Sequence, residues 1–83
     1  MSKLMYFRLR TQLRAWRILR DCMTEDGIII HRPVSGSGDR CQLGVDLLRY
    51  AGAIQKESRG RWYVSDREYI EQLEEWGRKN EKA

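Results

Sequence analysis

The sequence has no long apolar stretch. Its longest uninterrupted aliphatic run is Ile28–Ile30, whereas a membrane-spanning helix needs about 20 apolar residues. Arg8 and Arg10 interrupt the apolar region that a secretory signal would need near the N-terminus. We therefore expect neither a membrane span nor a signal peptide. The basic, acid-free start also resembles a mitochondrial presequence, but we favour its interpretation as the first helix of the domain.

Cysteine and histidine are scarce, with only Cys22, Cys41 and His31 present. Two thiols in a chain without a secretion signal favour a reducing compartment, so we expect a cytoplasmic protein without a disulfide framework. Zinc sites use close pairs such as C-x₂₋₄-C, and the sequence contains none. A lone histidine is more often a surface or strand-end residue than a catalyst. We expect no metal site.

A catalytic constellation is also lacking. The segment Gly36–Gly38 precedes a helix but is not followed by the Lys-Ser/Thr pair of a phosphate-binding loop. It is best interpreted as a connector, although a helix N-terminus there could still hold one phosphate. The glutamates of the last helix (Glu71, Glu74 and Glu75) are typical of a solvated face. The sequence therefore predicts no enzyme and no cofactor.

Positive charge is abundant and unevenly placed. The 83 residues carry a net charge of +4, and residues 1–20 hold six Lys and Arg but no acid. Residues 28–63 are basic again, whereas the acids gather at residues 21–26 and in the C-terminal helix. A polyanion partner is the usual reason for such asymmetry. A solvated, arginine-rich helix face is the alternative.

The first half of the chain predicts a long helix and a short strand. Apolar residues recur at helical spacing from about residue 6 to 23, with Arg10, Arg14 and Arg17 on the opposite stripe. Ser2 or Thr11 could be its N-cap, and Gly27 a left-handed terminator. Residues 28–31 then favour a strand, and residues 33–38 a loop.

The second half predicts a helix, a hairpin and a last helix. Asp39 suits an N-cap, followed by a buried stripe of Leu43, Leu47 and Tyr50 that ends before Gly52 and is flanked by Val45 and Leu48. Residues 53–57 and 61–65 form the hairpin arms, with Trp62 and Val64 toward the core. The S-x-x-E pattern at residues 65–68 starts the last helix, whose tail should fray from residue 78.

This order of elements predicts one α+β domain over residues 1–83, with about three helices, a short strand and a β-hairpin. The segment LLRYAGAIQKESRGRWYVS (residues 47–65) resembles the helix and wing of a winged-helix domain. The likeness departs from the family at two points. Residues 32–38 are too short and too rich in Gly and Pro for the usual second helix. Asp46 also lies on the face that should meet phosphates.

The resemblance implies a nucleic-acid-binding protein, most simply a DNA-binding regulator. The helix before the hairpin would enter the major groove, and the wing would touch the backbone. The expected contact residues are Arg10, Arg14, Arg17, Arg40, Gln42, Arg49, Lys56, Arg59, Arg61 and Tyr63. The alternative is a protein-interaction module of a phage or mobile element that docks to a larger nucleic-acid-handling complex. Trp16 and Trp76 are most simply core residues of the first and last helices; the alternative places one of them at a homodimer seam or a partner interface.

Overall fold

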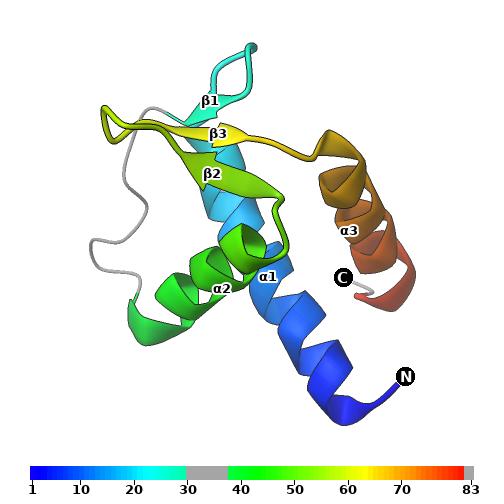
Figure 1. The fold of residues 1–83 in the computed structure, drawn as a ribbon. Helices are drawn as coiled ribbons and strands as arrows, with labels where there is room; N and C mark the ends of the chain where they lie inside the picture. The colour runs from blue at the N-terminus through cyan, green and yellow to red at the C-terminus, as the bar shows by residue number, and fades with distance from the viewer. Residues whose placement is uncertain (30–37, 82–83) are drawn as a thin grey trace.

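The computed structural model describes residues 1–29 and 38–81, and in the second range it describes side chains from residue 41 onward. These residues form three helices and a three-stranded antiparallel sheet. The order is α1 (Lys3–Asp21), β1 (Ile28–Ile29), α2 (Gly38–Tyr50), β2 (Ile54–Lys56), β3 (Trp62–Val64) and α3 (Arg67–Asn80). The predicted α+β class is confirmed, and the layout is compatible with a winged helix (Figure 1).

Helix α1 begins earlier than the apolar pattern alone suggests. Ser2 is its N-cap, because the Ser2 hydroxyl accepts a hydrogen bond from the Met5 N–H at 3.1 Å. Leu13, Trp16 and Leu19 form the expected buried stripe. The helix ends at Asp21. Gly27 therefore does not terminate it; with φ of 81°, this glycine lies in the turn that leads into β1.

The sheet has the strand order β1-β3-β2, so β3 lies in the middle. Ile28 pairs with Tyr63 in β3, and Ile54 of β2 pairs with Val64. Trp62 is 6% exposed and belongs to the core, and Val64 packs against that core, as the alternation predicts. The strand predicted over residues 28–31 is confirmed at its first two residues; the others lie outside the described residues.

Helix α2 is rotated relative to the sequence prediction. Leu43 is 41% exposed and Tyr50 is 94% exposed, so the predicted buried stripe is wrong. The flanking residues Val45 and Leu48 are buried as predicted, and together with Cys41 and Gly44 they make the inward face. The reason is the close crossing with α1: a Cβ on Gly44 would lie 2.5 Å from the Thr11 carbonyl oxygen. Only the glycine side of α2 can approach α1 this closely.

Helix α3 starts one residue later than predicted. Asp66 is the N-cap, and its Oδ1 accepts from the Tyr69 N–H at 3.0 Å. The Ser65 hydroxyl donates instead to the Gly52 carbonyl across the base of the hairpin. The helix continues to Asn80, beyond the residue where fraying was expected, because Gly77 is buried against Leu13 of α1.

Three predictions fall on residues that the structure does not describe. The loop predicted over residues 33–38 lies outside the described ranges except for Gly38. The prediction that the second helix of the winged-helix family is missing concerns the same residues. The Asp39 side chain, predicted as an N-cap, also lies outside the described part. Asp39 itself lies in the first turn of α2, which begins at Gly38.

Candidate nucleic-acid interface

Two cations from different elements meet at the ring of Trp62. The guanidinium carbon of Arg49, in the last turn of α2, lies 5.0 Å from the ring centroid. Lys56 Nζ, at the end of β2, lies 5.9 Å from the same centroid. Both separations fall within the range of cation–π attraction. The helix cation and the hairpin cation therefore both contact the same aromatic ring.

The chain between α2 and β2 makes this convergence possible. Gly52 adopts a φ of 79°, which reverses the chain directly after α2. Ala53 and Ile54 are then buried, so β2 begins close to the end of the helix. Arg49 consequently lies beside the strands although it belongs to the helix.

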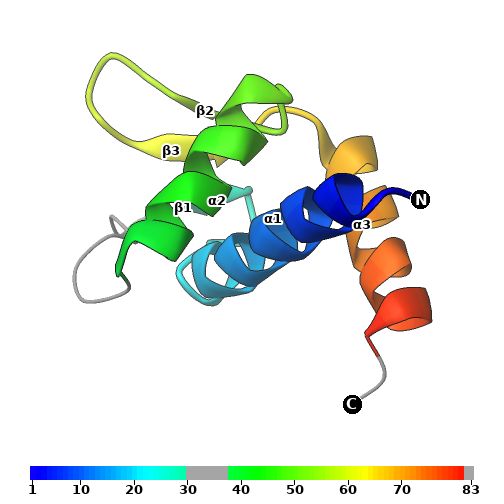
Figure 2. The ribbon, with the colours of Figure 1, turned by 90° about the horizontal axis from the view of Figure 1, so that it is seen from below.

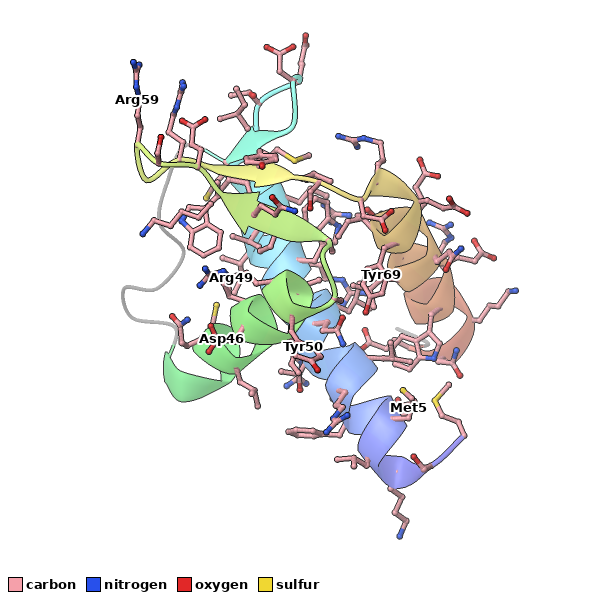
Figure 3. All side chains as sticks on the ribbon, in the orientation of Figure 1. Met5, Asp46, Arg49, Tyr50, Arg59 and Tyr69 are labelled. Atoms are coloured by element: carbon pink, nitrogen blue, oxygen red, sulfur yellow. The ribbon has the colours of Figure 1, made fainter. Side chains whose placement is uncertain are left out.

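An open groove runs along the same surface. It is lined by residues from the second half of α2 and from β2, namely Asp46, Arg49, Tyr50, Ile54, Gln55 and Lys56. Tyr50 extends into solvent from the end of α2, and Asp46 and Arg49 lie on the same helix (Figure 3). The groove thus combines an aromatic ring, two cations, an amide and a carboxylate.

The polar groups of this groove are partly engaged with one another. Asp46 Oδ1 accepts from Gln42 Nε2 at 2.9 Å, and Gln55 Oε1 accepts from the Tyr63 hydroxyl at 2.9 Å. The remaining Asp46 oxygen and the Gln55 amide hydrogens are not used in these two bonds. They are the groups with which the groove could recognise a ligand.

The tip of the hairpin carries Arg59, which points away from the body of the protein (Figure 3). Arg59 is exposed and forms no ion pair with the acids among the described side chains. Arg61 differs, because its Nε bonds Glu57 Oε1 within the hairpin. Of the two predicted tip arginines, Arg59 is therefore the one whose charge is not already matched.

The predicted residues of α1 lie elsewhere. Arg10 and Arg17 form ion pairs with Glu81, at 3.8 and 2.8 Å. Arg14 lines a different groove, beside Phe7 and Ile18. The N-terminal half of α1 extends away from the hairpin, and α2 and α3 lie on either side of α1 (Figures 1 and 2). The structure therefore places the three predicted residues of α1 apart from those of α2 and the hairpin.

The surface of α2 and the hairpin contains Gln42, Arg49, Lys56, Arg59 and Arg61. Tyr63 alternates with Trp62 along β3, so its side chain lies on the opposite face of the sheet, where its hydroxyl donates to Gln55. Arg40 lies in the first turn of α2, and its side chain is outside the described part. The sequence prediction did not include three residues of this surface, Tyr50, Gln55 and Trp62. Tyr50 was assigned to the core by a helical stripe that α2 does not use, and Trp62 was recognised only as a core residue. No sequence signal shows which cations a buried ring will contact.

The structure also shows where the potential metal ligands lie. Within residues 1–29 and 38–81, no three His, Cys, Asp or Glu side chains are grouped so that they could hold a metal ion. Cys22 is half-buried and Cys41 is buried, and His31 lies outside these ranges. Among the described helices none has the length and apolarity to cross a membrane.

The fold and this surface together define a class: a small α+β domain with a winged-helix-like layout, in which a helix and a β-hairpin present cations side by side. Comparison of the chain with known protein families, with curated proteins and with solved structures gives no match. The layout and the chemistry of the surface are thus the basis for assigning a function.

Proposed function

We propose that the protein binds nucleic acid, most simply duplex DNA, through α2 and the hairpin, as a small regulator would. The observation that carries this proposal is the meeting of Arg49 and Lys56 at the Trp62 ring. Two cations at one aromatic ring concentrate positive charge on this surface, and such a surface attracts a polyanion. The net charge of +4 favours the same class of ligand.

Each side chain of the surface suits one kind of DNA contact. Lys56 and Arg59 can neutralise phosphates, which positions the protein without reading sequence. A stacked guanidinium keeps its N–H donors at the ring edge, so Arg49 can donate to a phosphate or to guanine. The Gln55 amide can address adenine. The Asp46 carboxylate can accept a hydrogen bond from a cytosine amino group. An acid on the face that meets DNA is then a base-recognition group and is compatible with DNA binding.

The test is a fluorescence-anisotropy titration of labelled random duplex DNA at about 50 mM and about 200 mM salt. We expect log K to fall with log salt by about 0.9 for each phosphate contact. In the Lys56→Ala/Arg59→Ala variant, affinity should drop and the salt dependence should become shallower by roughly two contacts.

A matched control is Arg78→Ala/Lys79→Ala, which removes the same charge from α3. Both control residues pair with Glu75 and lie on a different element. This variant should bind DNA nearly as the wild type does. The proposal fails if the folded wild type does not bind at low salt. It also fails if the α3 variant loses as much affinity as the hairpin variant.

Tyr50 provides a second test within the same surface. Because the ring is 94% exposed, Tyr50→Ala should leave the unfolding transition unchanged. If the ring stacks on a base or sugar of the bound nucleic acid, the substitution should weaken binding by about 1–3 kcal/mol. Equal DNA affinity in wild type and variant would remove Tyr50 from the interface.

A further inference from the structure

A second groove lies along α1, on the surface that the proposed DNA interface does not use. We call it the α1 groove; its lining residues are Phe7, Arg10, Thr11, Arg14, Ala15 and Ile18 of α1, with Cys41 of α2. Phe7 is 48% exposed and Ile18 is 38% exposed, so both present apolar surface to solvent. Leu4, 59% exposed, continues the same helix face one turn earlier. Contiguous apolar exposure of this kind marks an interaction surface.

The electrostatic character of the α1 groove is positive. Residues 1–20 contain six Lys and Arg and no acid. Arg14 lines the groove and forms no ion pair with the acids among the described side chains. Arg10, at its edge, lies 3.8 Å from Glu81, a separation that allows only a weak, solvent-exposed pair. An occupant that carries carboxylates beside apolar side chains would match both properties.

Helix α3 already binds α1 in this way on the other side. Its Ile70 and Leu73 are buried in the core, and Glu74 accepts from the Trp16 indole at 2.9 Å. The same glutamate lies 3.4 Å from Arg20, and Glu81 at the end of the helix pairs with Arg17. One side of α1 thus holds an acidic amphipathic helix through apolar contacts flanked by Arg–Glu pairs.

We propose that the α1 groove binds an acidic amphipathic helix of another protein, in the manner in which α3 binds the opposite side of α1. At 1.5 Å per residue, the face from Leu4 to Ile18 is about 21 Å long, which matches a helix of about 14 residues. The occupant would place apolar side chains on Phe7 and Ile18 and a carboxylate against Arg14. This is helix-in-groove recognition.

A second copy of the chain does not fit this groove as well. The acidic helix that the described residues offer is α3, and its apolar side chains Ile70 and Leu73 are buried against the protein's own core. Its outward face carries Glu68, Glu71 and Glu75, with no large apolar residue among them. Two α1 helices facing each other would bring like charges together, since neither carries an acid in residues 1–20.

The test uses three synthetic helical peptides of about 14 residues. The first has leucines at i, i+3, i+4 and i+7 with glutamates beside them; the second replaces the glutamates by lysines; the third has the composition of the first in scrambled order. Titration of the full-length protein, followed by fluorescence anisotropy, should show saturable binding of the first peptide alone. The acidic peptide should bind at least about tenfold more tightly than either other peptide.

Two pairs of variants locate the binding. Phe7→Ala should weaken binding of the acidic peptide by about tenfold. Met5→Ala, at a residue equally exposed at 48% but outside the groove, should not. Arg14→Glu should abolish the preference for the acidic over the lysine peptide, whereas Arg8→Glu, with the same change of charge outside the groove, should retain it. Circular dichroism of each variant establishes that it is folded.

Several outcomes would overturn the inference. Equal binding of the ordered and scrambled acidic peptides would show charge attraction without a docking site. Absence of binding by the acidic peptide would contradict the proposal directly. Loss of its binding in Met5→Ala as much as in Phe7→Ala would show that the α1 groove is not where the peptide binds. Concentration-dependent dimerisation that Phe7→Glu abolishes would assign the groove to a second copy. None of these results bears on DNA binding by the hairpin variant, so the two proposals fail separately.

Discussion

At the scale of single residues, the core depends on a hydrogen bond between two helices. The Trp16 side chain is 1% exposed, and its indole N–H donates to Glu74 Oε1 at 2.9 Å. A buried donor left without an acceptor costs its full desolvation penalty, about 1–3 kcal/mol. Trp76 differs, because its buried indole N–H has no partner among the described residues.

Glu74→Ala should therefore lower the free energy of unfolding by about 1–3 kcal/mol, because the Trp16 N–H stays buried without an acceptor. Urea denaturation followed by tryptophan fluorescence measures this change. Glu71→Ala, on the exposed side of the same helix, is the control and should shift stability by no more than about 0.5 kcal/mol. Equal stability of the two variants would mean that the Trp16–Glu74 bond contributes nothing.

Tyr69 makes stability depend on alkaline pH. Burial raises the pKa of its phenol above the ordinary value of 10.0, because the charged phenolate is poorly solvated there. The fold therefore favours the neutral phenol. This contribution to stability is complete below the pKa of the unfolded chain, near 10.0, and is lost as pH rises through the higher folded pKa.

We expect the free energy of unfolding of the wild type to fall as pH rises above about 10. Tyr69→Phe should flatten that fall, although it also removes the hydrogen bond to Gln12 and so lowers stability at neutral pH. Tyr50→Phe, at an exposed tyrosine, should keep the alkaline slope of the wild type. Denaturation curves at several pH values give the slopes. An unchanged slope in Tyr69→Phe would exclude this tyrosine as the cause.

At the scale of elements, the crossing of α1 and α2 determines which face of α2 is presented to solvent. A Cβ on Gly44 would lie 2.5 Å from the Thr11 carbonyl oxygen and 2.6 Å from the Ala15 Cβ. Backbone atoms cannot yield as a side-chain methyl can, so the helices would have to separate. The exposure of Tyr50 and the position of Arg49 both follow from this contact.

Gly44→Ala should destabilise the protein by about 1–3 kcal/mol, because the strain of overpacking exceeds the gain in helix propensity. Gly77→Ala is an informative comparison, since its added Cβ would meet the Leu13 side chain and not a backbone atom. We expect Gly77→Ala to lower the free energy of unfolding by less than Gly44→Ala does. Thermal unfolding of both variants tests which substitution destabilises the protein more. A Gly44→Ala protein as stable as the wild type would show that the distance between α1 and α2 is adjustable.

At the scale of the whole molecule, the two proposed surfaces lie on different parts of a body that measures 38 × 26 × 24 Å. Arg49, Lys56 and Trp62 meet where α2 adjoins the hairpin, whereas the groove of Phe7 and Arg14 follows α1. Figure 1 shows the N-terminal half of α1 extending away from the hairpin. A protein with this arrangement could bring a partner to nucleic acid. At 0.1 M salt, charges more than about 10 Å apart in solvent are largely screened from one another.

Occupation of the α1 groove should therefore leave DNA binding nearly unchanged. With the acidic peptide at saturation, we expect the affinity for labelled duplex to stay within about twofold of its value without peptide. The same anisotropy titration, run with and without peptide, measures this. Displacement of the DNA by the peptide would show that both ligands use one surface and would contradict the division described above.

Local sequence signals were sufficient for the elements themselves. The 3.6-residue periodicity of α1, the alternation around Trp62 and the charged glycine-containing tip predicted the order of helices and strands and the α+β class. They succeeded because propensity, spacing and turn chemistry act between neighbours in the chain. The capping box predicted at Ser65 was wrong by one residue, because Asp66 is the N-cap and the Ser65 hydroxyl donates to the Gly52 carbonyl instead.

The sequence by itself also determined the basic character of the chain and the exposed position of Arg14, Arg17 and Arg59. Only the tertiary structure decided which of two apolar stripes of α2 is buried, because that choice depends on how closely Gly44 can approach α1. The same crossing places Arg49 beside Lys56 at the ring of Trp62. Contacts between residues far apart in the chain are set by packing, and no local pattern encodes them.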